Sequence, residues 1–168
     1  MTEIRTKRLL LRRARPDDLG AMHAILSDAE AMRYWSTLPH AELGQTRIWL
    51  DSMTAAPVAE SDDFVIERNG EVIGKAGCWK LPEIGYILHP SVWGRGYATE
   101  ALTAVVAHVF ANHAIPEIIA DVDPRNPASL TVLTKLGFRE TGRAERTIQI
   151  GDDWFDSIYL ALKRPDDH

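Results

Sequence analysis

The clearest candidate for chemistry in this sequence is a glycine-rich segment over residues 93–98, Trp-Gly-Arg-Gly-Tyr-Ala. Glycine at alternate positions lets a backbone approach a ligand closely. A strongly helical pattern follows, so the free N–H groups of the first helical turn would lie at the positive end of the helix dipole. Such an arrangement binds anions and suits a pyrophosphate. The alternative is a plain loop that uses glycine only to turn.

The spacing around this glycine loop argues against two other phosphate sites. A dinucleotide fingerprint needs a third glycine where this chain has Thr99, and the loop follows an antiparallel meander instead of a βαβ unit. A P-loop needs four residues between its two glycines, with lysine after the second. Gly70 and Gly74-Lys75 have one residue too few between the glycines, and they lie inside a predicted hairpin, so they do not form a P-loop. A nucleotide or dinucleotide binder is therefore disfavoured.

Length, charge and hydropathy exclude several classes of protein. The chain has 168 residues, 45% of them hydrophobic and 26% charged, which predicts one folded domain over residues 1–168. The net charge of −5 argues against nucleic acid as a partner, and the basic residues between Arg5 and Arg15 are interpreted as a solvated edge strand and turn. Because no apolar run reaches the length of a membrane span or a signal-peptide core, we expect no membrane partner and a cytoplasmic location.

Cysteine and histidine indicate no metal site. The single cysteine, Cys78, excludes an internal disulfide and is interpreted as a buried structural thiol. None of the histidines has the spacing of metal ligands, so we expect no metal. Trp35, Trp79 and Trp154 are expected in the core or in the walls of a pocket.

The elements that must position the glycine loop predict a mixed sheet covered by helices. Asn69-Gly70 between β-rich runs predicts a hairpin over 64–68 and 71–79, followed by a third antiparallel strand over 83–88. The apolar spacing over 98–110 predicts a helix. Further strands are expected over 8–13, 117–123, 147–150 and 154–162, and further helices over 16–26, 43–53 and 126–136. The hairpins require antiparallel pairing and the strand–helix–strand units require parallel crossovers, so the fold class is α/β with a mixed, mostly antiparallel sheet.

Several segments resemble those of a known family. Residues 83–88 with 93–101, and Asn-Pro-Ala-Ser at 126–129 with Lys-Leu-Gly-Phe at 135–138, are similar to the acetyl-CoA motif of the GNAT N-acetyltransferases. Residues 6–12 and 32–35 resemble the subgroup of ribosomal-protein N-terminal acetyltransferases of the RimJ/RimL type. The resemblance covers nearly the whole chain. It implies the GNAT fold, with acetyl-CoA as cosubstrate and no metal.

The resemblance also implies which residues bind the cofactor. Backbone amides of the loop would bind the CoA pyrophosphate, and these belong to Gly94, Arg95, Gly96, Tyr97 and Ala98. Trp93 departs from the Gln or Arg that the family often has, which leaves those amides intact. The strand before the loop would pair its backbone with the pantetheine arm through Tyr86, Ile87 and Leu88. Asn126 matches a position that hydrogen-bonds the cofactor arm, and it is equally well explained as a helix N-cap.

The implied reaction is attack of a neutral amine on a thioester carbonyl, which benefits from a base. Our candidate base is Glu83, at the start of the strand that resembles the family's catalytic strand; the alternative is a solvated carboxylate beside Pro82. We assign Glu100 to the helix dipole instead. Many family members protonate the leaving thiolate with a tyrosine, and the matching position here is Leu133. The acid is therefore missing. Ser129, the nearest hydroxyl, is a candidate to hydrogen-bond the sulfur, and the alternative is a serine that only satisfies the helix turn.

We therefore expect transfer of acetyl from acetyl-CoA to a primary amine, by direct attack in a ternary complex. The leading acceptor is a protein or peptide N-terminal amine. A small-molecule amine (polyamine, amino acid or aminoglycoside antibiotic) and a non-catalytic acyl-CoA-binding module are the alternatives. The acceptor, the base, the acid and the oligomeric state stay open, and the last two strands are candidates for pairing in a homodimer.

Overall fold

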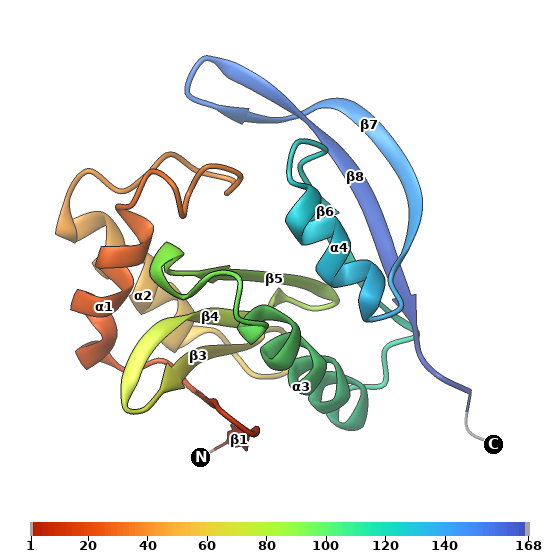
Figure 1. Cartoon of the computed structure of the whole chain (residues 1–168), viewed down its shortest axis with the longest axis horizontal. Coiled ribbons are helices and arrows are strands. Elements are labelled where there is room, and N and C mark those ends of the chain that lie inside the picture. The colour runs from red at the N-terminus through yellow and green to blue at the C-terminus, as the bar shows by residue number, and fades with distance from the viewer. Residues whose placement is uncertain (1, 167–168) are drawn as a thin grey trace.

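One mixed sheet organises the residues described by this computed structural model, residues 2–166. Its eight strands follow the order β1-β2-β3-β4-β5-β6-β8-β7. Neighbouring strands are antiparallel except β5 and β6, which run parallel (Figure 1). The strands are β1 (Glu3–Arg5), β2 (Leu10–Arg12), β3 (Asp62–Arg68), β4 (Glu71–Lys80), β5 (Glu83–Leu88), β6 (Glu117–Val122), β7 (Arg139–Ile150) and β8 (Asp153–Lys163).

The helices cover both faces of the sheet. Helices α3 (Tyr97–Asn112) and α4 (Pro127–Lys135) pack on one face, where side chains such as Leu102, Val105 and Leu133 join the main core. Helices α1 (Leu19–Leu26) and α2 (Leu43–Ala55) lie on the other side of β4 and β5 (Figure 1), where Met22, Ile25 and Leu26 pack on Ile87. Each fully buried apolar side chain contributes about 1.5–3 kcal/mol, so both faces are held by burial. Two short 3₁₀ turns, Pro16–Asp18 and Pro90–Val92, precede α1 and the glycine loop.

The sheet opens between its two parallel strands. Strands β5 and β6 pair only at Glu83 and Ile119 in the described structure, where the Ile119 N–H donates to the Pro82 carbonyl at 3.0 Å. Beyond that point β5 stays paired with β4 while β6 stays paired with β8, so the two halves of the sheet separate (Figure 1). The divergence leaves the β6-facing edge of β5 without a strand partner.

Most predicted elements are confirmed, and the exceptions lie at the sheet edges. The strand expected over 8–13 is the short β2, and β1 was not predicted. The strand expected over 147–150 is the end of a much longer one, since β7 begins at Arg139. Its side chains are mostly exposed, so hydrogen bonds to β8 hold it and no apolar alternation marks it in the sequence.

The interpretation of residues 5–15 as a solvated edge is wrong for Arg12 and Arg13. Arg12 is 4% exposed, and its guanidinium donates to Asp18 at 2.7 and 2.9 Å and to Glu67 at 3.1 Å. Arg13 donates to the fully buried Asp62 at 2.6 Å. Their partners come from helical and β segments elsewhere in the chain, so internal ion pairs replace solvation.

Candidate active site

The glycine loop has a backbone shape that favours glycine. Gly94 and Gly96 have φ of +75° and +80°, in the left-handed region that other residues rarely adopt. Nothing lies within 4 Å of the position that a Gly94 β-carbon would occupy, so conformation, and not crowding, requires glycine there. Gly96 is the N-cap of α3, which places the loop amides at the start of a 16-residue helix.

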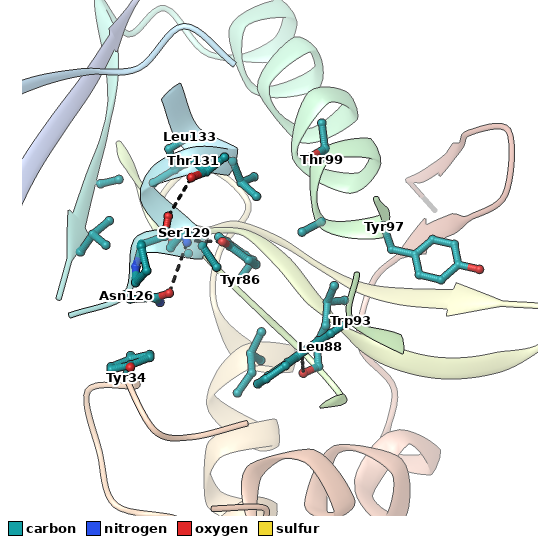
Figure 2. Close-up of a pocket in the computed structure, with 18 of the residues that line it drawn as sticks. Tyr34, Tyr86, Leu88, Trp93, Tyr97, Thr99, Asn126, Ser129, Thr131 and Leu133 are labelled. Carbon is teal, nitrogen blue, oxygen red and sulfur yellow. Dashed lines mark hydrogen bonds between the residues drawn. The ribbon is translucent and has the colours of Figure 1, made fainter. Parts of the chain in front are cut away.

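A cavity of about 660 Å³ lies between β5, the glycine loop, β6 and α4 (Figure 2). It brings together nearly all the cofactor residues that the sequence suggested. Its walls include Tyr86, Ile87, Leu88, Gly94, Gly96, Tyr97, Ala98, Asn126 and Ser129. Among the described residues of that predicted set, Arg95 alone does not line the cavity. Its carbonyl oxygen accepts a hydrogen bond from Arg8 Nη1 at 2.8 Å.

The free edge of β5 forms one wall of this cavity. Because β6 diverges after Glu83, backbone groups over 85–88 face the cavity instead of a neighbouring strand. Such an edge can pair with an extended amide-bearing chain, as the pantetheine arm of CoA is. Trp93 closes one end of it, since its indole Nε1 donates to the Leu88 carbonyl at 2.9 Å. The tryptophan that departs from the family pattern thus ties the loop to β5.

Two hydroxyl groups, one from β5 and one from α4, meet in this cavity. The phenol of Tyr86 donates to Ser129 Oγ at 3.0 Å (Figure 2). The Ser129 backbone N–H donates to Asn126 Oδ1 at 3.2 Å, so Asn126 is the N-cap of α4. Burial raises the pKa of Tyr86, and the hydrogen bond with Ser129 offsets this in part. The phenol therefore stays protonated.

The hydroxyl of Tyr86 is the feature of this site that sequence reasoning missed. The tyrosine position on α4 is occupied by Leu133, which is buried in the core and lines the cavity. A phenol reaches Ser129 from β5 instead. The alternation of β5 was the available signal, because it places Tyr86 on the same face as Ile84 and Leu88, which join the core beneath α3 and α4.

A second cavity of about 600 Å³ adjoins the first. The two share residues from β5, β6 and the segment after α1, namely Tyr34, Trp35, Ile84, Gly85, Asp121 and Asp123. Its walls add aromatic side chains from distant parts of the chain, Trp49, Trp79 and Phe155, together with the carboxylate of Glu83. Two molecules bound in adjoining cavities can meet at this shared boundary.

Glu83 lines the second cavity, and its pKa is raised. Burial is the main cause, followed by the negative charge of Asp121, and Lys80 partly offsets both. The pairing of Glu83 with Ile119 places Asp121, two residues further along β6, on the same face of the sheet. A carboxylate with a raised pKa binds a proton more strongly than an ordinary one, which suits it to act as a base near neutral pH.

The remaining candidates lie apart from this chemistry. Cys78 is fully buried, and burial together with Asp63 and Asp62 raises the pKa of its thiol to about 12, as expected for an inert structural cysteine. Trp35 lines both cavities and Trp79 lines the second, as expected for pocket walls. Trp154 is 45% exposed and lines neither of these cavities, so the expected place in the core or a pocket wall is wrong for Trp154. Residues 2–166 contain no cluster of three or more side chains that could hold a metal ion. Every helix described is too short or too polar to span a bilayer.

Comparisons with known proteins identify the family. A model of the acetyltransferase (GNAT) domain matches residues 8–139. The uncharacterized N-acetyltransferase YoaA of Bacillus subtilis is 31% identical over 171 residues, covering 95% of this chain and 96% of that protein. The ribosomal protein uS5-alanine N-acetyltransferase of Escherichia coli is 32% identical over 103 residues, covering 57% and 53%. The spermidine N(1)-acetyltransferase of Escherichia coli is 25% identical over 163 residues, covering 90% and 84%.

Solved structures agree on the fold. A GNAT-family acetyltransferase from Bacillus anthracis superposes with a TM-score of 0.84 and 27% identity, covering 96% of this chain and 98% of the other. A ribosomal-protein α-N-acetyltransferase in complex with coenzyme A superposes with a TM-score of 0.83 at 19% identity, covering 96% and 98%. The predicted fold class is thereby confirmed, and the cavity walls fit the cofactor of this family. The chain belongs to the GNAT acetyltransferases, enzymes that use acetyl-CoA as the acyl donor.

Proposed function

We propose that this N-acetyltransferase acts by direct transfer in a ternary complex and that its acceptor is the N-terminal amine of a protein or peptide. Residues 1–168 would act as one domain. The observation that carries the proposal is the shared boundary of the two cavities, with cofactor-type walls on one side and Glu83 on the other. Direct attack needs both substrates bound at once, and adjoining cavities permit this without a covalent enzyme intermediate.

The acidity of the amine favours an N-terminal acceptor. An α-amine has a pKa near 8, so about a tenth of it is neutral at pH 7, whereas a lysine-type amine with a pKa of about 10.4 is almost fully charged. A carboxylate with a raised pKa, such as Glu83, removes a proton from the former at a smaller free-energy cost than from the latter. The relative that acetylates an alanine of ribosomal protein uS5 supports the same acceptor class and the RimJ/RimL-type subgroup.

Each proposed catalytic group has one task. Acetyl-CoA supplies an activated acetyl group as a thioester. Glu83 takes one proton of the acceptor ammonium, and the neutral amine then forms the N–C bond as the C–S bond breaks. The nitrogen loses its second proton to solvent to give the amide, and the departing thiolate takes up a proton from solvent to give free CoA. Ser129 Oγ accepts from the Tyr86 phenol, which leaves its own hydrogen free to donate to the departing thiolate. A thiol has a pKa of about 8.5 against about 10 for a phenol, so we assign hydrogen bonding, and not proton transfer, to this pair.

Small polyamines are a second candidate acceptor class. The second cavity combines Glu83 and Asp121, which lack a hydrogen-bonded basic partner among the described residues, with the aromatic rings of Trp35, Trp79 and Phe155. Carboxylates and aromatic faces both attract ammonium groups. One of the relatives acts on spermidine, which is consistent with this alternative.

A panel of acceptors tests the proposal. Release of free CoA would be followed with peptides bearing a free N-terminus, the same peptides with the N-terminus blocked but a lysine present, and spermidine. We expect turnover with the free N-termini alone. Turnover with spermidine alone would overturn the peptide assignment in favour of the polyamine. Acetyl-CoA binding without turnover on any amine would favour the non-catalytic acyl-CoA-binding module.

A further inference from the structure

The N-terminal segment Thr6–Arg8 is tied to the first turn of α3 at the glycine loop. Glu100 Oε2 accepts from the Arg8 backbone N–H at 2.9 Å and from the Thr6 hydroxyl, and Glu100 Oε1 accepts from Arg8 Nε at 2.7 Å. Arg8 Nη1 then donates to the Arg95 carbonyl at 2.8 Å. One arginine therefore bridges a carboxylate in the helix and a peptide group inside the loop.

The hydrogen bond to Arg95 has a consequence for the next amide. The Arg95–Gly96 peptide is trans, so its carbonyl and its N–H point in opposite directions. Arg95 does not line the cofactor cavity among the described residues, whereas Gly96 does. Holding the Arg95 oxygen toward Arg8 therefore directs the Gly96 N–H away from Arg8, the direction in which a pyrophosphate oxygen would be bound.

The guanidinium also packs closely behind the loop. A β-carbon on Gly96 would lie 3.4 Å from Arg8 Nη2, and the Arg8 guanidinium lies 4.3 Å from the centroid of the Tyr97 ring. These contacts hold the plane of the guanidinium against residues 96 and 97. The loop is thus supported from the side opposite to its cavity wall.

Charge balance gives Arg8 a second role. Glu100 lies in the first turn of the helix whose amides would face a dianionic pyrophosphate. Burial alone would raise the pKa of Glu100, but hydrogen bonds from Thr6 and Arg8 outweigh it and lower that pKa. The carboxylate therefore stays charged, and the adjacent guanidinium neutralises a negative charge that would otherwise repel the cofactor.

We propose that Arg8 is a positioning residue for cofactor binding, which fixes the glycine loop through the Arg95 carbonyl and Glu100 so that the loop amides face the pyrophosphate. The inference rests on the proposed placement of the pyrophosphate at this loop. Arg8 itself does not line the cavity among the described residues. The competing explanation is a tether that only attaches β1 and β2 to α3.

Variants of Arg8 separate these two roles. Arg8→Gln should raise the KM for acetyl-CoA and the Kd for CoA about tenfold, since the lost hydrogen bonds involve charged groups. Its kcat at saturating acetyl-CoA should stay within about twofold of the wild type. Arg8→Lys should be intermediate, because an ammonium keeps the charge but cannot bridge two acceptors in fixed geometry. Arg5→Gln is the matched control, as the exposed Arg5 pairs with Glu3 and, within residues 2–166, with no other acidic side chain.

Truncated ligands locate the effect. S-acetylpantetheine lacks the pyrophosphate, so its kcat/KM should be the same in Arg8→Gln and wild type, whereas 3′-phospho-ADP should lose the same affinity as CoA. Equal losses for both fragments, or a lower melting temperature with unchanged acetyl-CoA KM, would overturn the positioning role in favour of a tether. Calorimetry on the wild type keeps the two proposals apart. If the wild type fails to bind 3′-phospho-ADP, the pyrophosphate site itself is wrong; if wild type and Arg8→Gln bind it equally, only the role of Arg8 is wrong.

Discussion

The two adjoining cavities are built in different ways. The cofactor cavity is lined mainly by runs of consecutive residues, over 84–88, 92–94, 96–99, 120–123, 126–129 and 131–133, and it offers backbone groups. The second cavity is lined by scattered side chains from the segment after α1, from α2, from β3, β4 and β5, and from the β7–β8 hairpin. Backbone groups can bind a cofactor that is common to a family, because this requires only the correct turn conformations. The choice of acceptor depends instead on side chains supplied by many segments.

The largest effect is expected at Glu83, near the boundary of the two cavities, where a loss of catalysis can be distinguished from a loss of cofactor binding. Glu83→Gln removes the proposed base and should lower kcat by about 10²–10⁴-fold while acetyl-CoA still binds. Steady-state kinetics with calorimetry of CoA binding measure both quantities. Glu71→Gln is the control, because Glu71 is an exposed carboxylate at the β3–β4 hairpin. Equal loss of CoA affinity in Glu83→Gln would place Glu83 in the cofactor site instead.

Variants of Ser129 and Tyr86 test whether hydroxyl groups in the cofactor cavity take part in the reaction. Ser129→Ala should lower kcat about 10–100-fold, the range for a lost hydrogen bond to a charged group. The Asn126 cap should survive, because it uses the Ser129 backbone N–H. Tyr86→Phe should cost less, and the double variant should be no slower than Ser129→Ala, since the phenol acts through Ser129. Additive losses in kcat would show that Tyr86 acts on its own.

At the glycine loop, cofactor binding should depend more on the backbone conformation than on the room available for a side chain. Gly96→Ala forces a side chain into φ +80°, at a cost of about 1–2 kcal/mol, and should raise the acetyl-CoA KM about tenfold. Gly44→Ala, within α2 and with nothing within 4 Å of the added carbon, should leave that KM unchanged. Melting curves and acetyl-CoA titrations of both variants make the comparison, and an unchanged KM in Gly96→Ala would contradict a binding role for the loop backbone.

The smallest effect concerns pH. Asp121 helps to raise the pKa of Glu83, so Asp121→Asn should lower that pKa. The base must be deprotonated to act, so kcat/KM falls as pH drops through the Glu83 pKa, and in the variant this acid limb should move to lower pH. Profiles of kcat/KM against pH for the two proteins measure the shift. An acid limb that stays in place or moves upward would assign the limb to another group.

Sequence reasoning succeeded where the signal is local in the chain. The predicted Asn69-Gly70 hairpin is present, with φ of +51° and +81°, and the predicted helix follows directly after Gly94 and Gly96. It failed for β7, whose exposed side chains carry no alternation, and for Arg12, which is buried against Asp18 and Glu67. Secondary-structure propensity reflects only a few neighbouring residues. The formation of β7 and the burial of Arg12 depend on partners that are distant in the sequence.

The sequence by itself determined the glycine loop, the N-cap Asn126, the order of most elements and hence the family, because each depends on backbone preferences within one turn or strand. Only the tertiary structure decided which side chains meet. Tyr86 reaches Ser129 across 43 positions, and Arg8 reaches Glu100 across 92. The charge of Asp121 helps to raise the pKa of Glu83 because β5 and β6 pair in one particular register. Such distant pairs follow from sheet register and helix packing, which are cooperative properties of the whole fold.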